Sequence, residues 1–395
     1  MAIEMALDVW PALPISIRSK LKDDDLDGDD IIAALEHRER IIEVDLSGLS
    51  GPQLESCVAL MQEPFPILRT LSLECNPETT TLVIPDTFLR GSAPRLRSVN
   101  LCHVPFPTLP KLLLSASHLV ELQLEEIPKT GYISPDAMAM CLAVLTRLEF
   151  VTISSPFWRS FPQNQTNQHR PPMSRAVLPS LTEFAFGSVS GEYLDDLMAR
   201  IHLPRLNYLH LQFFPLPTFS VPKLPQIVHH IETFKPPFQA IVGFYDKSTD
   251  ISIFLPGRGS LGLVFQRTES ENQLSWLTRI YPQLLPHLSQ INYLELFNHV
   301  QDDQHSTLWL AFLRPFSAVK SLCIHDQNSL RQIARVLGEL TDGRAVGVLP
   351  MLDTIVWSDK TVWDQVKSWL FPLVQPFIDA RQLLGHPVVV KSRAP

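Results

Sequence analysis

A glycine-rich stretch contains the first residues that could do chemistry. Residues 257–264 (GRGSLGLV) have the spacing G-x-G-x-x-G-x-V of a kinase loop that covers ATP phosphates. A kinase also needs a lysine on a following strand and H-R-D and D-F-G triplets, but the next lysine is Lys320 and neither triplet occurs. A dinucleotide site needs a helix after the loop, where LGLVF predicts a strand. We therefore predict a glycine turn and no cofactor. An enzyme that uses this loop is kept as a third functional hypothesis, beside the two that are given at the end of this section.

Two groups of potential metal ligands have unsuitable spacing. Positions 1, 3, 5 and 6 of a calcium-loop pattern are filled, in order, by Asp23, Asp25, Asp27 and Gly28. Position 12, which must supply a bidentate Glu, is Ala34. His229, His230 and Glu232 lack the H-E-x-x-H spacing, and adjacent histidines on a helix point about 100° apart. No metal site is predicted.

Nucleophiles and thiols give no catalytic pattern either. The stretch 187–191 (GSVSG) has Val at the centre, where a nucleophile elbow needs Ser. The five cysteines are odd in number and include no C-x-x-C pair, which favours reduced core thiols over a disulfide framework or a zinc site. We expect no catalytic residues, and the chain is predicted not to be an enzyme.

Composition indicates which classes of partner and which cellular compartment to expect. Lys and Arg total 33 against 41 Asp and Glu, so the net charge of −8 disfavours nucleic acid. The first ten residues lack the basic and apolar regions of a secretory signal, and no apolar run reaches about 18 residues. We expect an intracellular protein, cytoplasmic or nuclear, that has no membrane partner.

The elements that would position any site repeat along the chain. The pattern apolar-x-x-apolar-x-apolar begins at Ile41, Leu68, Leu96, Leu119, Leu148, Leu181, Leu206, Ile291, Val319 and Leu352. Successive starts are 23 to 33 residues apart, except for one step of 85, which is about three periods and predicts two degenerate strands near 238–245 and 261–265. This spacing is typical of leucine-rich repeats. The predicted fold is an α/β irregular leucine-rich-repeat solenoid, with parallel strands on the concave face and short helices on the convex face.

Proline and apolar spacing set the phase of the repeat. Five of the ten starts have a proline two residues earlier, which we expect to preset extended backbone at the strand start: Pro66, Pro94, Pro179, Pro204 and Pro350. Apolar residues at i, i+3, i+4 and i+7 predict helices beginning near Leu54, Met138, Leu194 and Leu330. Ser134, followed by a proline and an acid, predicts a capped start for the second. The repeat asparagine occurs once, as Asn76, so irregular turns are expected.

These patterns divide the chain into three regions. Residues 1–40 form an N-terminal cap with an acidic loop and a helix, and residues 41–361 form the repeat array. Within the array, 162–174 is predicted to be a flexible loop and 214–260 a degenerate hairpin insertion. Residues 362–395 form a C-terminal helical cap and tail, whose helix we expect to be interrupted by its two prolines.

The candidate site is the surface made by the strands. Because strand side chains alternate, the third and fifth residues of each repeat point away from the core. Eight such residues, which combine aromatic and polar side chains, are predicted to bind protein: Glu121, Gln123, Phe150, Thr152, Tyr208, His210, Tyr293 and Glu295. Exposed aromatics beside carboxylates suit protein recognition, although ordinary solvated strand residues are the alternative.

Several segments also resemble a known family. They include DDIIAALEHRERI, MQEPFPILRTLSL, LPKLLLSASHLVELQL and EYLDDLMARIHLPRLNYL. From about Trp10 to Val390, the chain resembles the leucine-rich-repeat portion of F-box proteins from mushroom-forming (basidiomycete) fungi. In that family, an F-box of about fifty residues upstream docks on the adaptor of a cullin-type ubiquitin ligase, and the repeats capture protein substrates.

The chain departs from this family at the F-box itself. Residues 13–17 (LPISI) resemble an F-box opening, but the acidic stretch 23–30 follows where apolar helices belong. The resemblance therefore implies a non-catalytic protein-recognition module, the substrate-receptor part of an SCF-type ubiquitin ligase subunit, whose partners are protein substrates and, if an F-box lies upstream, the ligase adaptor. The alternative is an F-box-less leucine-rich-repeat scaffold or decoy without a ligase role.

Overall fold

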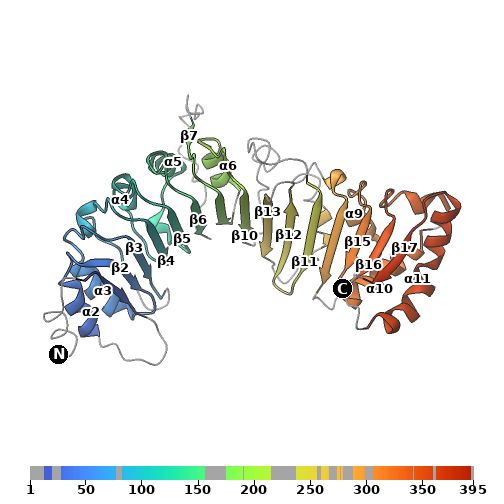
Figure 1. The fold of residues 1–395 in the computed structure, drawn as a ribbon, viewed down its shortest axis with the longest axis horizontal. Helices are drawn as coiled ribbons and strands as arrows, with labels where there is room; N and C mark the ends of the chain where they lie inside the picture. Colours follow the sequence, from blue (N-terminus) through green and yellow to red (C-terminus); the bar gives the residue numbers. More distant parts are fainter. Residues whose placement is uncertain are drawn as a thin grey trace. The chain divides into compact units, whose positions relative to one another are not determined.

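The computed structural model forms two compact units, which divide between Leu206 and Asn207. Unit 1 precedes this point and unit 2 follows it, and each contains a largely parallel β-sheet with helices (Figure 1). The residues that the structure describes are 13–19, 28–76, 82–155, 175–189, 191–214, 237–255, 259–266, 274–275, 277–278, 288–298, 306–340, 342–358 and 362–392. The α/β class predicted from the sequence is confirmed.

The described sheet of unit 1 has seven strands that pair in chain order, all in parallel register. The strands are β1 (Ile15–Arg18), β2 (Ile41–Leu46), β3 (Thr70–Glu74), β4 (Ser98–Cys102), β5 (Glu121–Glu125), β6 (Phe150–Ser155) and β8 (Glu183–Ser188). A separate parallel pair consists of β7 (Ala176–Val177) and β9 (Ile201–His202). The six strands predicted in this unit are confirmed, and β1 is an additional strand.

The described helices of unit 1 lie between successive strands. They are α2 (Gly28–Leu35), α3 (Gly51–Leu60), α4 (Leu109–Ser115), α5 (Pro135–Val144) and α6 (Glu192–Met198), with short 3-10 turns at η1 (Phe88–Gly91) and η2 (Lys129–Gly131). Figure 1 shows α4, α5 and α6 following one another along one side of the strands. The predicted cap of α5 is present, because the Ser134 hydroxyl accepts a hydrogen bond of 3.2 Å from Ala137 N. The predicted apolar stripes are buried and form the core with the strand leucines.

Several of the prolines lie in a turn that precedes a strand, which differs from the expected extended start. Residues 65–68 form a four-residue turn in which Leu68 N donates to Phe65 O (3.2 Å) and Pro66 occupies the second position. Proline suits this position because its φ is fixed near the value that the turn needs. The same bond closes the turns at Leu96 (3.1 Å) and Leu352 (2.9 Å). The phase was predicted from sequence, but its physical cause is turn geometry.

In two repeats of unit 1, an apolar side chain occupies the position of the repeat asparagine. Val104 and Ile127 stand there and are buried, whereas Asn76 is exposed. The preceding residues, His103 and Glu126, have left-handed backbone with φ of 57° and 51°. These side chains fill the core instead of hydrogen-bonding a turn, and the two turns share a left-handed residue at the same repeat position.

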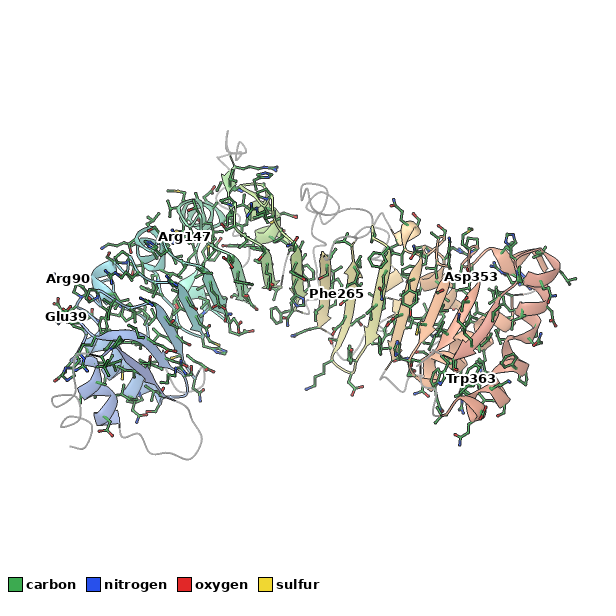
Figure 2. The ribbon with its side chains drawn as sticks, in the orientation of Figure 1. Glu39, Arg90, Arg147, Phe265, Asp353 and Trp363 are labelled. Atoms are coloured by element: carbon green, nitrogen blue, oxygen red, sulfur yellow. The ribbon has the colours of Figure 1, made fainter. Side chains whose placement is uncertain are left out.

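Unit 2 has a sheet in which one described strand runs against the others. Its order is β10-β13-β12-β11-β14-β15-β16-β17, and β12 is antiparallel to both neighbours while the remaining pairs are parallel. The strands are β10 (Tyr208–Phe213), β11 (Gln239–Phe244), β12 (Ser248–Phe254), β13 (Ser260–Gln266), β14 (Tyr293–Asn298), β15 (Ser321–Ile324), β16 (Thr354–Trp357) and β17 (Val389–Ser392). The predicted hairpin around 246–250 and both degenerate strands are confirmed. Under this sheet, Phe213 and Phe265 stack with ring centroids 5.3 Å apart, and Phe265 is labelled in Figure 2.

Three helices described in unit 2 lie in its C-terminal part. They are α9 (Ser306–Leu313), α10 (Gln327–Gly338) and α11 (Trp363–Leu383), with 3-10 turns η3 (Leu288–Gln290) and η4 (Asp342–Val346). Helix α10 packs against α9, α11 and the strands β14 and β15. Among the helices in the described ranges, none combines the length and the apolar character needed to cross a membrane.

At the C-terminus, one expectation was wrong and one strand was not predicted. Helix α11 is continuous through Pro372 and Pro376 rather than interrupted. Both prolines are exposed, so water can hydrogen-bond the carbonyls that lose their donors. The tail contains β17, which pairs with β16 and extends the sheet beyond the helical cap that was predicted.

Candidate functional site

The residues predicted to bind protein lie on the face of each sheet opposite the core, which we call the outward face. In β5, Leu122 and Leu124 are buried, whereas Glu121 and Gln123, which alternate with them, are only half-buried. The same alternation holds in β6, where Phe150 is 37% exposed and Val151 is buried. Strand geometry alone produces this division, because successive side chains point to opposite faces.

Parallel register arranges the outward residues of unit 1 in rows. One row contains the third residues of the repeats, in the order Glu43, Thr70, Ser98, Glu121, Phe150 and Glu183. The next contains the fifth residues, in the order Asp45, Ser72, Asn100, Gln123, Thr152 and Ala185. The structure therefore brings Glu121 beside Phe150 and Gln123 beside Thr152. Glu183, on the other side of Phe150, was not among the predicted residues.

Hydrogen bonds fix the Glu121 carboxylate in its row. Ser98 Oγ donates to Glu121 Oε2 over 3.0 Å, and Gln123 Nε2 donates to Glu121 Oε1 over 2.6 Å. Both oxygens are thus held by neighbours on the outward face. A carboxylate oriented in this way loses little conformational freedom when a partner approaches.

The outward face of unit 1 is strongly acidic. Strands β2 to β6 and β8 contain no Lys, Arg or His, and their outward residues include Glu43, Asp45, Glu74, Glu121, Glu125 and Glu183. Arg18 of β1 donates two hydrogen bonds of 2.8 and 2.9 Å to Glu43. This guanidinium lowers the pKa of the Glu43 carboxyl, against the opposing effect of burial. A face with this charge attracts cationic groups and repels acidic ones.

In unit 2, Tyr208 and His210 lie on the outward side of β10. Tyr208 is 42% exposed and is paired in register with Ser260. His210 is opposite Gly262, and a Cβ atom at that glycine would lie only 2.7 Å from His210 Nδ1. Partial desolvation of the imidazole lowers the pKa of His210, and Asp250 opposes the shift. Gly262 therefore lies in the strand predicted over 261–265, where its missing side chain leaves room for an imidazole.

Tyr293 and Glu295 of β14 meet two residues that sequence reasoning missed. Glu295 Oε2 is 3.2 Å from Nε2 of His325, and Cys323 Sγ is 3.6 Å from the same nitrogen. Burial, with smaller effects of the nearby Cys323 and Glu295, raises the pKa of Tyr293. Glu295 is only 6% exposed, so a protein partner cannot contact it without rearrangement.

The sequence contained a signal for this group. Glu295 and Cys323 are both the fifth residue of their repeats, and such residues of adjacent repeats become register neighbours. Cys323 and His325 are two residues apart, so on extended backbone they share a face. Applying repeat position to cysteines, rather than searching for C-x-x-C spacing, would have found them.

Other residues considered as ligands fall outside the described part of the chain. These are Asp23, Asp25, Asp27, His229, His230 and Glu232, together with the predicted loop 162–174. No protein-family model matches the chain, and no curated protein shows significant sequence similarity to it.

Proposed function

We propose that the chain is an irregular leucine-rich-repeat protein that recognises other proteins and catalyses no reaction itself. The repeat assignment is supported by the ten phased strands, the common hydrogen-bonded turn before them and the helices between most of them. A repeat protein of this kind presents a continuous row of outward side chains, which suits binding of an extended or folded partner surface.

The observation that carries the recognition proposal is the row in which Phe150 lies between Glu121 and Glu183. An aromatic ring flanked by two carboxylates suits an Arg or Lys side chain, because the ring attracts a cation and each carboxylate can pair with it. The strands around it supply no competing cation. We therefore propose that unit 1 recognises a basic segment of its partner. In unit 2, Tyr208 and His210 stay candidates for contact because both are exposed.

Selection of peptides tests this proposal even though the natural partner is unidentified. A random-peptide phage library is selected on the immobilised full-length protein. We expect the recovered peptides to be enriched in Arg and Lys, and their recovery to fall on Phe150→Ala and on the double variant Glu121→Gln/Glu183→Gln. The matched control, Glu55→Gln/Glu192→Gln, removes the same charge from exposed positions on helices α3 and α6 of the same unit. Recovery of neutral or acidic peptides, or equal loss in the control, would contradict the proposal.

The family resemblance extends the proposal to a substrate-receptor role in a cullin-type ubiquitin ligase. This extension predicts that the protein, isolated from its own cells, co-purifies with the ligase adaptor and cullin in a defined ratio. If a bound partner is present but the adaptor and cullin are not, the scaffold or decoy function is the correct one. That result leaves the recognition surface itself unaffected.

A further inference from the structure

A group of three side chains on the outward face of unit 2 combines a carboxylate, a thiol and an imidazole. Glu295 of β14 and Cys323 of β15 are direct register partners. His325 follows β15, and its backbone N donates to Leu296 O over 3.0 Å, which keeps it alongside β14. Within the described residues, no other group brings three such ligand atoms within 4.8 Å of one another.

The contacts of His325 are unlike those of a catalytic relay. In a thiol–imidazole–carboxylate relay, the nucleophile and the carboxylate contact different ring nitrogens. Here the thiol and the carboxylate both approach Nε2, at 3.6 and 3.2 Å. A single proton on Nε2 can be directed at only one of them. Two anionic ligand types and one nitrogen that converge in this way resemble instead the ligand set of a metal ion.

The separations also fit a four-coordinate ion. With Zn–S near 2.3 Å and Zn–N and Zn–O near 2.0 to 2.1 Å, tetrahedral angles place S about 3.6 Å from N, and N about 3.3 Å from O. The corresponding separations in the structure are 3.6 and 3.2 Å. We propose that Glu295, Cys323 and His325 bind a zinc-type divalent cation, with a fourth position left for water or another ligand.

The surroundings hold the three ligands in place. The Phe297 ring stacks on the His325 imidazole, with centroids 3.8 Å apart and planes at 16°. Tyr293 lies two residues before Glu295 on the same face of β14. Such neighbours orient ligands and support affinity. Cys323 is fully buried, and the Glu295 and His325 side chains are only 8% and 17% exposed, so a dication would compensate charge that water reaches poorly.

The donor set selects among cations. A thiolate with an imidazole suits zinc and related transition metals, whereas Ca²⁺ and Mg²⁺ prefer sites built from oxygen. Because the site lies in unit 2 and uses none of the residues in the Glu121–Phe150–Glu183 row, it is independent of the recognition proposal. Either proposal can fail alone.

Cobalt titration tests the site directly. The untagged full-length protein is stripped of metal with a chelator and titrated with Co²⁺. We expect one equivalent to bind with thiolate-to-cobalt charge-transfer absorption and the strong visible bands of four-coordinate Co²⁺, and Zn²⁺ to displace it. If the wild-type protein shows no charge-transfer band, the proposal is wrong, whatever the variants do.

Variants then assign the ligands. Cys323→Ser should abolish the charge-transfer band, and His325→Gln should weaken Co²⁺ binding at least about tenfold. The control is Cys102→Ser, because Cys102 also contacts a histidine, with Sγ 3.2 Å from His103 Nδ1, but belongs to unit 1. Far-ultraviolet circular dichroism checks folding. If the band survives in a folded Cys323→Ser variant, or is lost in Cys102→Ser, the assignment is overturned.

Discussion

Arg381 is a charged residue that is buried in the protein interior. Its side chain is 1% exposed, although it lies on a terminal helix. The guanidinium donates to the carbonyls of Leu352 (2.6 Å), Pro350 (3.0 Å) and His386 (3.2 Å). Burial lowers its pKa. Arg381 therefore supplies donors to a loop backbone that would otherwise be buried with unsatisfied acceptors, and it joins α11 to the turn before β16.

We predict that Arg381→Met lowers the free energy of unfolding by at least about 2 kcal/mol, because several buried carbonyls lose their donors. Chemical denaturation of the full chain measures the change. The control is Lys367→Met, which removes an exposed cation from the same helix. A loss no larger than that of the control would show that water replaces the guanidinium.

For single residues, the sequence was enough to predict the face of the sheet on which a side chain lies, but not how deeply its neighbours bury it. Alternation along strands sufficed to place Glu121, Phe150 and Tyr208 on the outward face. Glu295 obeys the same alternation, yet its neighbours bury it, and no pattern within its own strand encodes that. Gly262 likewise leaves room for the side chain of His210, which lies on another strand.

Among the elements, helices α10 and α11 illustrate how close packing depends on a small residue. A Cβ atom at Gly338, the last residue of α10, would lie 2.2 Å from the Leu373 carbonyl oxygen of α11. That neighbour is backbone, so it cannot move away as a flexible side chain would. The glycine therefore permits the contact between the two helices.

Gly338→Ala should destabilise the protein by about 1–3 kcal/mol, even though alanine favours helix more than glycine does. Thermal unfolding provides the measurement. Arg335→Ala, at an exposed position of α10, introduces the same residue without the clash and should change stability by only a few tenths of a kcal/mol. An unchanged or raised melting temperature for Gly338→Ala would show that the helices can separate without cost.

Elements with a strong local pattern were predicted well. The strands with phased leucines and the helices with one apolar stripe are where periodicity placed them. Strand β17 was missed because residues 389–392 have no repeat pattern and gain their partners from β16. The continuity of α11 was missed because proline was judged by propensity alone, whereas its cost depends on which side of the helix faces solvent.

For the whole molecule, repeat order explains why distant segments share a face. Each unit pairs its strands largely in chain order, so residues about 28 positions apart become neighbours without any long-range signal. The exception is the antiparallel strand β12, which local alternation predicted as part of a hairpin. The row of Glu121, Phe150 and Glu183 follows from this order, and we propose that it recognises a basic partner segment.

The most direct test is the affinity of one fluorescently labelled basic peptide, taken from the phage selection, measured by anisotropy for the wild-type protein and two charge-matched double variants. We predict that Glu121→Gln/Glu183→Gln weakens binding at least about tenfold and reduces its salt dependence, while Glu55→Gln/Glu192→Gln leaves the dissociation constant nearly unchanged. Equal dissociation constants for the two variants would contradict the assignment of this face as the recognition surface.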